Sequence, residues 1–232
     1  MKLTVIGSSP AWPNPGAAQS GYLVEGHGRL LLDCGPGVLA RLRAGDAWPA
    51  IDAVAVSHLH LDHVGDLVAW VWAHLMGPAR GAPRTPLWLP PGGTSELEAL
   101  AAQISETFEI QEYADGQTFE AAGFRVTAVA LSHFDTDAFG LRITDGSRTL
   151  AYSGDSGPTS ALVELARGAD LFLCEATLAE AEPGARGHLA AEEALAASDE
   201  AGAGRLVLTH RPVELPPPDG CDVAVDGLVI EL

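Results

Sequence analysis

Six short apolar runs in this sequence each end at a residue that can bind a metal ion or hold a proton. These residues are Asp33 after "LLL", His58 after "VAVS", His133 after "VALS", Asp155 after "AYSG", Glu175 after "LFLC" and His210 after "LVLT". Apolar runs of this length between turn residues are typical of β-strands. Side chains at strand ends can converge on one edge of a sheet while the strands stay rigid. The pattern therefore predicts a sheet-based fold with a reactive site at one edge.

Helical patterns separate some of the predicted strands. They cover residues 65–76, 94–104, 158–167 and 189–202, and the last is rich in Ala and Glu. Strand hairpins that alternate with single helices indicate a layered α/β fold, with helices covering two mixed sheets. No Pro/Gly-rich stretch has the character of an interdomain linker, which predicts a single domain over 1–232. Trp70 and Trp72, on the first helix, are both expected to pack against a sheet, with lining of the substrate cleft as the alternative.

The stretch "VSHLHLDHVGDL" (residues 56–67) concentrates four potential metal ligands. They are His58, His60, Asp62 and His63. Imidazole binds borderline cations such as zinc, and a carboxylate adds neutralising charge. His58 and His60 can reach one ion from an extended turn, whereas the adjacent Asp62 and His63 point differently and suit a second ion. Four residues cannot complete two sites, so further ligands must come from the other strand ends.

Together with Asp33 in "LLDCGPG", the order of these motifs resembles that of the metallo-β-lactamase-fold hydrolases. The resemblance covers nearly the whole chain and implies a four-layer αββα sandwich with two mixed sheets. It implies one metal ion on His58, His60 and His133 and a second on Asp62, His63 and His210, with Asp155 and a hydroxide bridging them. The ions would be zinc, with manganese or iron as alternatives. Asp33 would accept a hydrogen bond from a ligand and fix its orientation.

Within this fold the chain is similar to the tRNase Z branch and its smaller phosphodiesterase relatives. The similarity is carried by "GLRI" after His133, "YSGDSGP", "CEATL" at 174–178, "GHLAAEEALAAS" from Gly187 and "GRLVLTH" at 204–210. It implies that Glu175 orients His188 and that His188 protonates the leaving oxygen. A carboxylate beside an imidazole favours the charged, acidic form of the ring. Asp62 would hold the attacking water or accept its proton.

Two features separate the chain from tRNA-processing enzymes. His133 and Asp155 are only 22 positions apart, enough for a strand hairpin, whereas bacterial tRNase Z carries a long Gly/basic arm there. The net charge is −18, with 31 acidic residues against 13 Lys and Arg, and nucleic-acid binders usually present a basic surface. We therefore predict a binuclear metal-dependent hydrolase of a small phosphodiester, such as a cyclic nucleotide, in preference to RNA.

Three alternatives remain open at this stage. They are a tRNase Z-like 3′-end endoribonuclease, a lactone or thioester hydrolase of the same fold, and a metal-binding protein without turnover. No apolar run approaches the roughly 18–20 residues that span a bilayer. The apolar stretch within "MKLTVIGSSP" is too short for a secretory signal. These observations predict a cytoplasmic protein without a membrane partner, and the resemblance allows a homodimer. Phe134, Asp135 and Asp137 are expected in a solvated loop, with contact to the substrate as the alternative.

Overall fold

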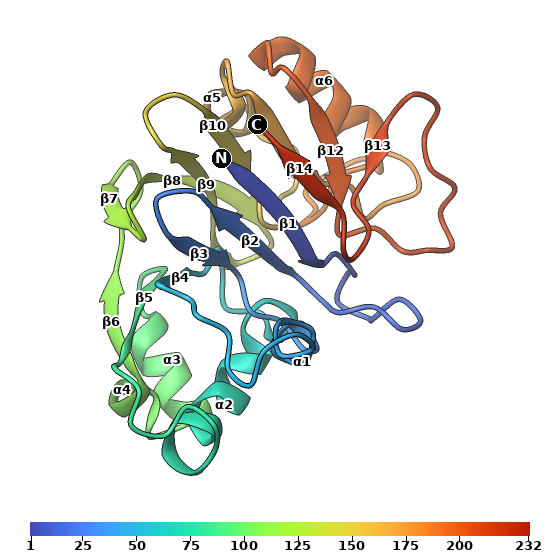
Figure 1. Cartoon of the computed structure of the whole chain (residues 1–232). Coiled ribbons are helices and arrows are strands. Elements are labelled where there is room, and N and C mark those ends of the chain that lie inside the picture. The colour runs from blue at the N-terminus through green and yellow to red at the C-terminus, as the bar shows by residue number, and fades with distance from the viewer.

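The computed structural model describes residues 1–232 and contains two seven-stranded sheets (Figure 1). The first sheet has the order β14-β1-β2-β3-β4-β5-β6 and the second has the order β13-β12-β11-β10-β9-β8-β7. The strands of the first sheet are β1 (Lys2–Gly7), β2 (Gly21–Glu25), β3 (Arg29–Leu32), β4 (Ala53–Ala55), β5 (Thr85–Leu89), β6 (Phe108–Glu112) and β14 (Val229–Glu231). Those of the second are β7 (Thr118–Ala121), β8 (Phe124–His133), β9 (Thr136–Thr144), β10 (Thr149–Tyr152), β11 (Leu171–Glu175), β12 (Leu206–Thr209) and β13 (Asp222–Val223).

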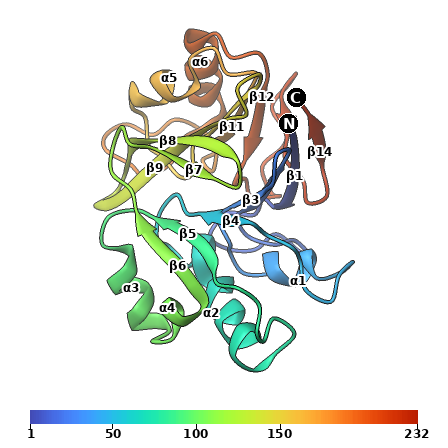
Figure 2. The ribbon, with the colours of Figure 1, turned by 60° about the vertical axis from the view of Figure 1, so that its left-hand side comes forward.

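Helices cover the outer face of each sheet. The first sheet is covered by α1 (Val38–Leu42), α2 (Leu61–Met76), α3 (Gly93–Leu100) and α4 (Ile104–Thr107). The second sheet is covered by α5 (Ala161–Ala166) and α6 (Ala191–Ala201). Figure 2 shows the helices on opposite sides of the two sheets. The predicted four-layer αββα arrangement is confirmed.

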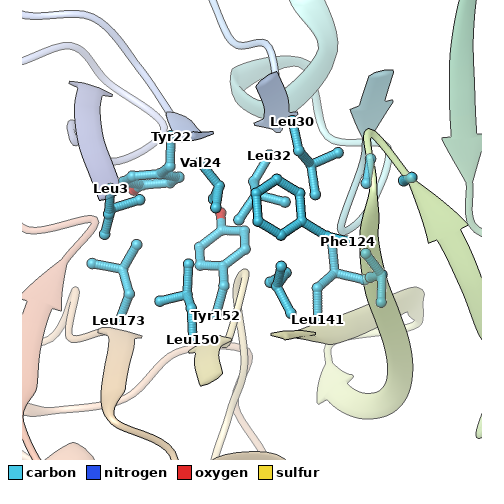
Figure 3. Packing of buried hydrophobic residues seen from close by; sticks show 14 of the residues in the cluster. Leu3, Tyr22, Val24, Leu30, Leu32, Phe124, Leu141, Leu150, Tyr152 and Leu173 are labelled. Carbon is cyan, nitrogen blue, oxygen red and sulfur yellow. The ribbon is translucent and has the colours of Figure 1, made fainter. Parts of the chain in front are cut away.

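The inner faces of the two sheets enclose the largest apolar cluster. Leu3, Val24 and Leu32 of the first sheet face Leu141, Leu150 and Leu173 of the second (Figure 3). Burying one such side chain completely is worth about 1.5–3 kcal/mol, so this layer stabilises the pairing of the sheets strongly. Strand β1 alternates half-buried and buried residues, because one of its faces meets the opposite sheet. The sheets therefore form a rigid frame for the side chains at their edge.

Helix α2 begins four residues earlier than predicted, at Leu61. Its first turn thus contains Asp62, whose negative charge is favourable at the positive end of the helix dipole. Gly65 lies inside the helix, where a Cβ would stand 2.9 Å from the Pro36 side chain, so glycine lets the loop after β3 pack closely. The start of α2 and the loop after Asp33 are therefore held together.

The prediction for Trp72 was wrong. Trp70 is buried, but Trp72 is 51% exposed. Two residues along a helix correspond to a rotation of about 200°, so the two rings cannot share the buried face. The structure also contains elements that were not predicted, namely α1, β6, β7 and β13, and it splits the predicted helix 94–104 into α3 and the start of α4. No helix is both long and apolar enough to span a membrane.

Candidate metal centre

The predicted strand-end residues converge on one edge of the sandwich. Asp33 follows β3 and His58 lies just beyond β4, both in the first sheet. The second sheet contributes His133 at the end of β8, Asp155 just beyond β10, Glu175 at the end of β11 and His210 after β12. Because both sheets supply side chains, the packing between the sheets sets the distances within the site.

The backbone is strained at this edge. Only four non-glycine residues have positive φ, and three of them are Asp33 (57°), Phe134 (49°) and His210 (55°). Such a conformation costs about 1–3 kcal/mol per residue and persists only where the surroundings impose it. The positive φ turns the chain sharply just as a strand ends. The side chains of Asp33 and His210 therefore enter the site directly.

Seven side chains form two adjoining groups of potential metal ligands. The His60 group consists of His58, His60, His133 and Asp155, and the His63 group consists of Asp62, His63, His210 and Asp155. Within each group the ligand atoms all lie within 4.8 Å of one another. Asp155 belongs to both groups, as expected for a bridging carboxylate. The structure thus brings the residues together with the division that the family resemblance implies.

Four of the five histidine rings are oriented by a hydrogen bond at Nδ1. The Nδ1 partners are Ser57 Oγ for His58 (3.1 Å), Asp33 Oδ2 for His63 (2.7 Å), the Gly187 carbonyl for His133 (2.7 Å) and Thr177 Oγ1 for His210 (2.9 Å). Their Nε2 atoms lie 3.2–3.9 Å from the Asp155 carboxylate. His60 is reversed, with Nδ1 inward, 3.0 Å from His133 Nε2, and Nε2 3.3 Å from Thr136 Oγ1. Partners of this kind fix the orientation of metal-binding histidines.

Asp33 is fully buried and accepts four hydrogen bonds. The donors are the Ser57 N–H (2.7 Å) and hydroxyl (2.8 Å), the Tyr152 hydroxyl (2.5 Å) and His63 Nδ1–H (2.7 Å). The carboxylate is therefore held in place from three directions, and it in turn fixes the ring of His63. This geometry suits the orienting role expected for Asp33 and shows that His63 is its partner.

A cation fits this site because two buried atoms in it lack a partner. His58 Nε2 and Asp155 Oδ1 are shielded from solvent and have no hydrogen bond. His63 Nε2 lies 3.2 Å from Asp155 Oδ1, but the contact lacks hydrogen-bond geometry. Buried polar atoms are nearly always paired, and nitrogen and carboxylate donors in this number suit zinc and similar ions. A metal ion in each group would satisfy both atoms.

The protonation of several candidate ligands favours metal binding. Burial lowers the pKa of His58 well below its usual value and also lowers that of His133, so both rings are neutral near pH 7. Burial would raise the pKa of Asp62 and Asp155, but contacts with His210 and His63 hold both pKa values well below the usual range. Neutral imidazoles and ionised carboxylates are the forms that bind metals. His63 differs, because burial would lower its pKa but the Asp155 and Asp33 carboxylates raise it well above the usual value, so a metal ion there displaces a proton.

Glu175 and His188, the predicted pair, lie beside the two groups and are hydrogen-bonded. His188 Nδ1 is 2.9 Å from Glu175 Oε1, and the Glu175 carboxylate is fully buried. The His188 ring stacks on that of His210, with centroids 5.7 Å apart. Burial would lower the pKa of His188, but the Glu175 carboxylate raises it above its usual value. Glu175 therefore holds the ring in place and favours its charged form.

The sequence interpretation missed the role of Thr177, the third residue of "EAT". Its Oγ1 lies 2.9 Å from Glu175 Oε2 and 2.9 Å from His210 Nδ1. The hydroxyl can accept the His210 ring proton and donate its own proton to Glu175. The motif thus orients two rings, those of His188 and His210. The signal in the sequence was a hydroxyl residue, Thr177, close after Glu175. Cys174 at the start of the motif is fully buried.

A known protein family, described as "Beta-lactamase superfamily domain", matches residues 28–211. The chain belongs to the beta-lactamase superfamily. The uncharacterized protein Rv1339 of Mycobacterium tuberculosis is 37% identical to the chain over 224 residues, which cover 91% of this chain and 81% of that protein. The crystal structure of the metallo-beta-lactamase fold protein YhfI from Bacillus subtilis superposes with a TM-score of 0.87 at 30% identity and covers 99% of both chains.

A third relative is named after an activity on RNA. The protein called Ribonuclease Z of Mycobacterium bovis is 28% identical over 243 residues, covering 90% of this chain and 85% of that protein. The B. subtilis relative YhfI is named a probable metallo-hydrolase and is 34% identical to this chain. The chain thus has the family and the fold of a beta-lactamase superfamily metallo-hydrolase. Its paired His/Asp groups are suited to binding metal ions.

Proposed function

We propose that the protein is a phosphodiesterase that hydrolyses a small phosphodiester, such as a cyclic nucleotide, with two divalent ions that are most simply zinc. The observation that carries this proposal is the Glu175–His188 pair next to the two metal-ligand groups. Phosphodiester hydrolysis expels an alkoxide, which leaves far more readily when an acid protonates it. A thioester expels a thiolate, which leaves without an acid, so the pair argues against that alternative. A lactone also expels an alkoxide, so the assays described below separate it from a phosphodiester.

The residues divide the work between metal binding and proton transfer. Ions held by the His60 and His63 groups would lower the pKa of a water molecule and stabilise charge on the attacked phosphate. His188 Nδ1–H donates to Glu175, and Nε2, which has no partner in the protein, is the atom that delivers a proton to the leaving oxygen. The low pKa of Asp62 makes it a weak base, which favours holding the attacking water over accepting its proton.

The surface beside the site supports a small substrate. A hollow of about 230 Å³ adjoins His60 and is lined by Leu59, His60, Pro91, Glu96, Asp135, Thr136 and Asp137. We call it the acidic hollow. Its three carboxylates and the net charge of −18 repel a polyanion more than a singly charged phosphodiester. Only residues 134–135 connect β8 to β9, so this hairpin carries no arm of the kind that grips tRNA.

The test compares leaving groups in the wild type and in His188→Ala. We expect the zinc-loaded wild type to hydrolyse both cyclic AMP and bis(p-nitrophenyl) phosphate. His188→Ala should lose about 10²–10⁴-fold in kcat on cyclic AMP, the usual contribution of a positioned acid. The loss on bis(p-nitrophenyl) phosphate should be much smaller, because p-nitrophenolate leaves without a proton.

The control variant is His27→Ala, which removes an exposed histidine in the β2–β3 hairpin, outside the candidate site. It should keep wild-type rates on both phosphodiesters. A model lactone and a p-nitrophenyl ester are assayed in parallel, together with a precursor tRNA. Turnover of the lactone or ester alone would overturn the proposal, and preferential cleavage of the precursor tRNA would replace it with the ribonuclease alternative.

A further inference from the structure

Phe134 exposes a large aromatic ring next to the candidate active site. It lies in the β8–β9 turn directly after His133 and is 64% exposed. Its ring centroid is 4.9 Å from that of His133 and 5.7 Å from that of His188, to which it stands nearly perpendicular, at 80°. Phe134 therefore adjoins both a candidate metal ligand and the proposed acid.

The ring is held in this position by the backbone on both sides. Phe134 itself has a φ of 49°, a strained conformation for a residue with a side chain. A Cβ on Gly187 would stand 2.3 Å from the Phe134 ring, so the ring packs directly on a backbone that must be glycine. One side of the ring thus packs against the protein. Much of the rest is exposed to water, which is unfavourable for an apolar surface.

A hollow of about 260 Å³ lies against this ring. It is lined by Ser132, Phe134, Asp135, Ala185 and Arg186. The Arg186 guanidinium is paired with the Glu193 carboxylate and also contacts the Glu182 carbonyl. Because its charge is already neutralised, Arg186 does not make the hollow a site for a second phosphate. An uncharged planar group fits the aromatic ring, the hydroxyl of Ser132 and the small side chain of Ala185 better.

We propose that Phe134 is a specificity-determining residue on which the base of a nucleotide substrate stacks. This inference rests on the proposed function and narrows its substrate class to phosphodiesters that carry a nucleobase. The phosphate would lie at the metal centre, and the base would lie over Phe134 in the adjoining hollow. Stacking of a base on an aromatic side chain is sequence-tolerant, so it favours nucleotides in general over phosphodiesters without a base.

The test measures binding of AMP and ribose 5-phosphate to the full-length, zinc-loaded protein by isothermal titration calorimetry. The two probes share the phosphate and the ribose and differ only in the base. The wild type should bind AMP about tenfold more tightly, within the range known for base stacking on aromatic residues. Phe134→Ala should reduce the preference to less than about twofold, and Phe134→Tyr should restore it.

Kinetics and a control separate this role from a structural one. On cyclic AMP, Phe134→Ala should raise KM by about tenfold with kcat nearly unchanged. Stacking of the base stabilises the bound substrate and the transition state equally, so its loss weakens binding without slowing the chemical step. Trp72→Ala removes another half-exposed aromatic, about three turns along α2 from Leu61, and should leave the preference for AMP intact.

The outcomes distinguish the two proposals. Equal affinity of the wild type for AMP and ribose 5-phosphate, or a preference that survives in Phe134→Ala, would overturn the role of Phe134 while leaving the phosphodiesterase proposal standing. Failure of the loaded wild type to bind either phosphate would overturn both.

Discussion

The two halves of the candidate metal centre are supported very differently. In the His63 group, His63 is fully buried and bonded to the buried Asp33 carboxylate, and His210 is bonded to Thr177. In the His60 group, His60 is only half-buried and has a 3.3 Å contact with Thr136. The His63 group is thus fixed by a charged, buried network. In the His60 group, His58 and His133 are buried and hydrogen-bonded to neutral partners, but the group opens at His60 toward the acidic hollow.

This difference indicates a division of labour within one centre. A carboxylate that orients a histidine also raises its basicity and its affinity for a metal ion. We therefore expect the His63 group to bind its ion more tightly and the His60 group to be the half that exchanges its ion and meets the substrate first. Three substitutions test this comparison.

The largest effect is expected for Asp155→Ala, which removes the one ligand that the two groups share. Metal content, measured by inductively coupled plasma mass spectrometry after gel filtration, should fall from two ions per chain to less than one. Phosphodiester hydrolysis should disappear with it. If both Asp155→Ala and His133→Ala kept full metal content and full activity, the ligand assignment would be wrong.

A smaller effect is expected for Asp33→Asn, which keeps the shape of the side chain but removes its charge. The affinity of the tighter ion should fall about 10–100-fold, the usual effect of losing such a partner. Competition with a chromophoric chelator measures it. Asp66→Asn is the matched control, because this half-buried carboxylate on α2 accepts a hydrogen bond from the Leu39 N–H and not from a histidine. Equal losses in the two variants would argue against a specific role for Asp33.

The smallest effect is expected for Thr136→Val. The contact between Thr136 Oγ1 and His60 Nε2 is long and half-exposed, and even a typical hydrogen bond contributes only about 0.5–1.5 kcal/mol. The affinity of the weaker ion should fall by less than about threefold in the same chelator titration, and that of the tighter ion should not change. A loss as large as that of Asp33→Asn would erase the proposed difference between the two halves.

The sequence predicted the fold class and the convergence of the site residues for a clear reason. Apolar strands that end in His, Asp or Glu are local patterns, and strand ends meet at a sheet edge whatever the details of packing. The HxHxDH cluster is likewise local. These patterns were enough to anticipate that Asp155 would lie between the two groups once the family resemblance supplied the order.

The remaining features depend on contacts between distant segments. No local pattern reveals that β14 pairs with β1, where Leu3 lies opposite Ile230. The partners of the histidines were also missed, since a carbonyl such as that of Gly187 is present at every position of a chain. Helix periodicity alone shows that Trp70 and Trp72 cannot share the buried face. Which of the two is exposed depends on the direction in which α2 faces the sheet, and only the packed structure determines that direction.

The acidic hollow bears on how fast a substrate reaches the centre. If the substrate is a nucleotide as proposed, it passes Glu96, Asp135 and Asp137 on its way to His60, and their repulsion acts over a Debye length of about 10 Å at 0.1 M salt. Dissolved ions weaken this repulsion, so the association rate constant of an anionic substrate should rise with ionic strength. Proteins that hold nucleic acids by their phosphates behave in the opposite way.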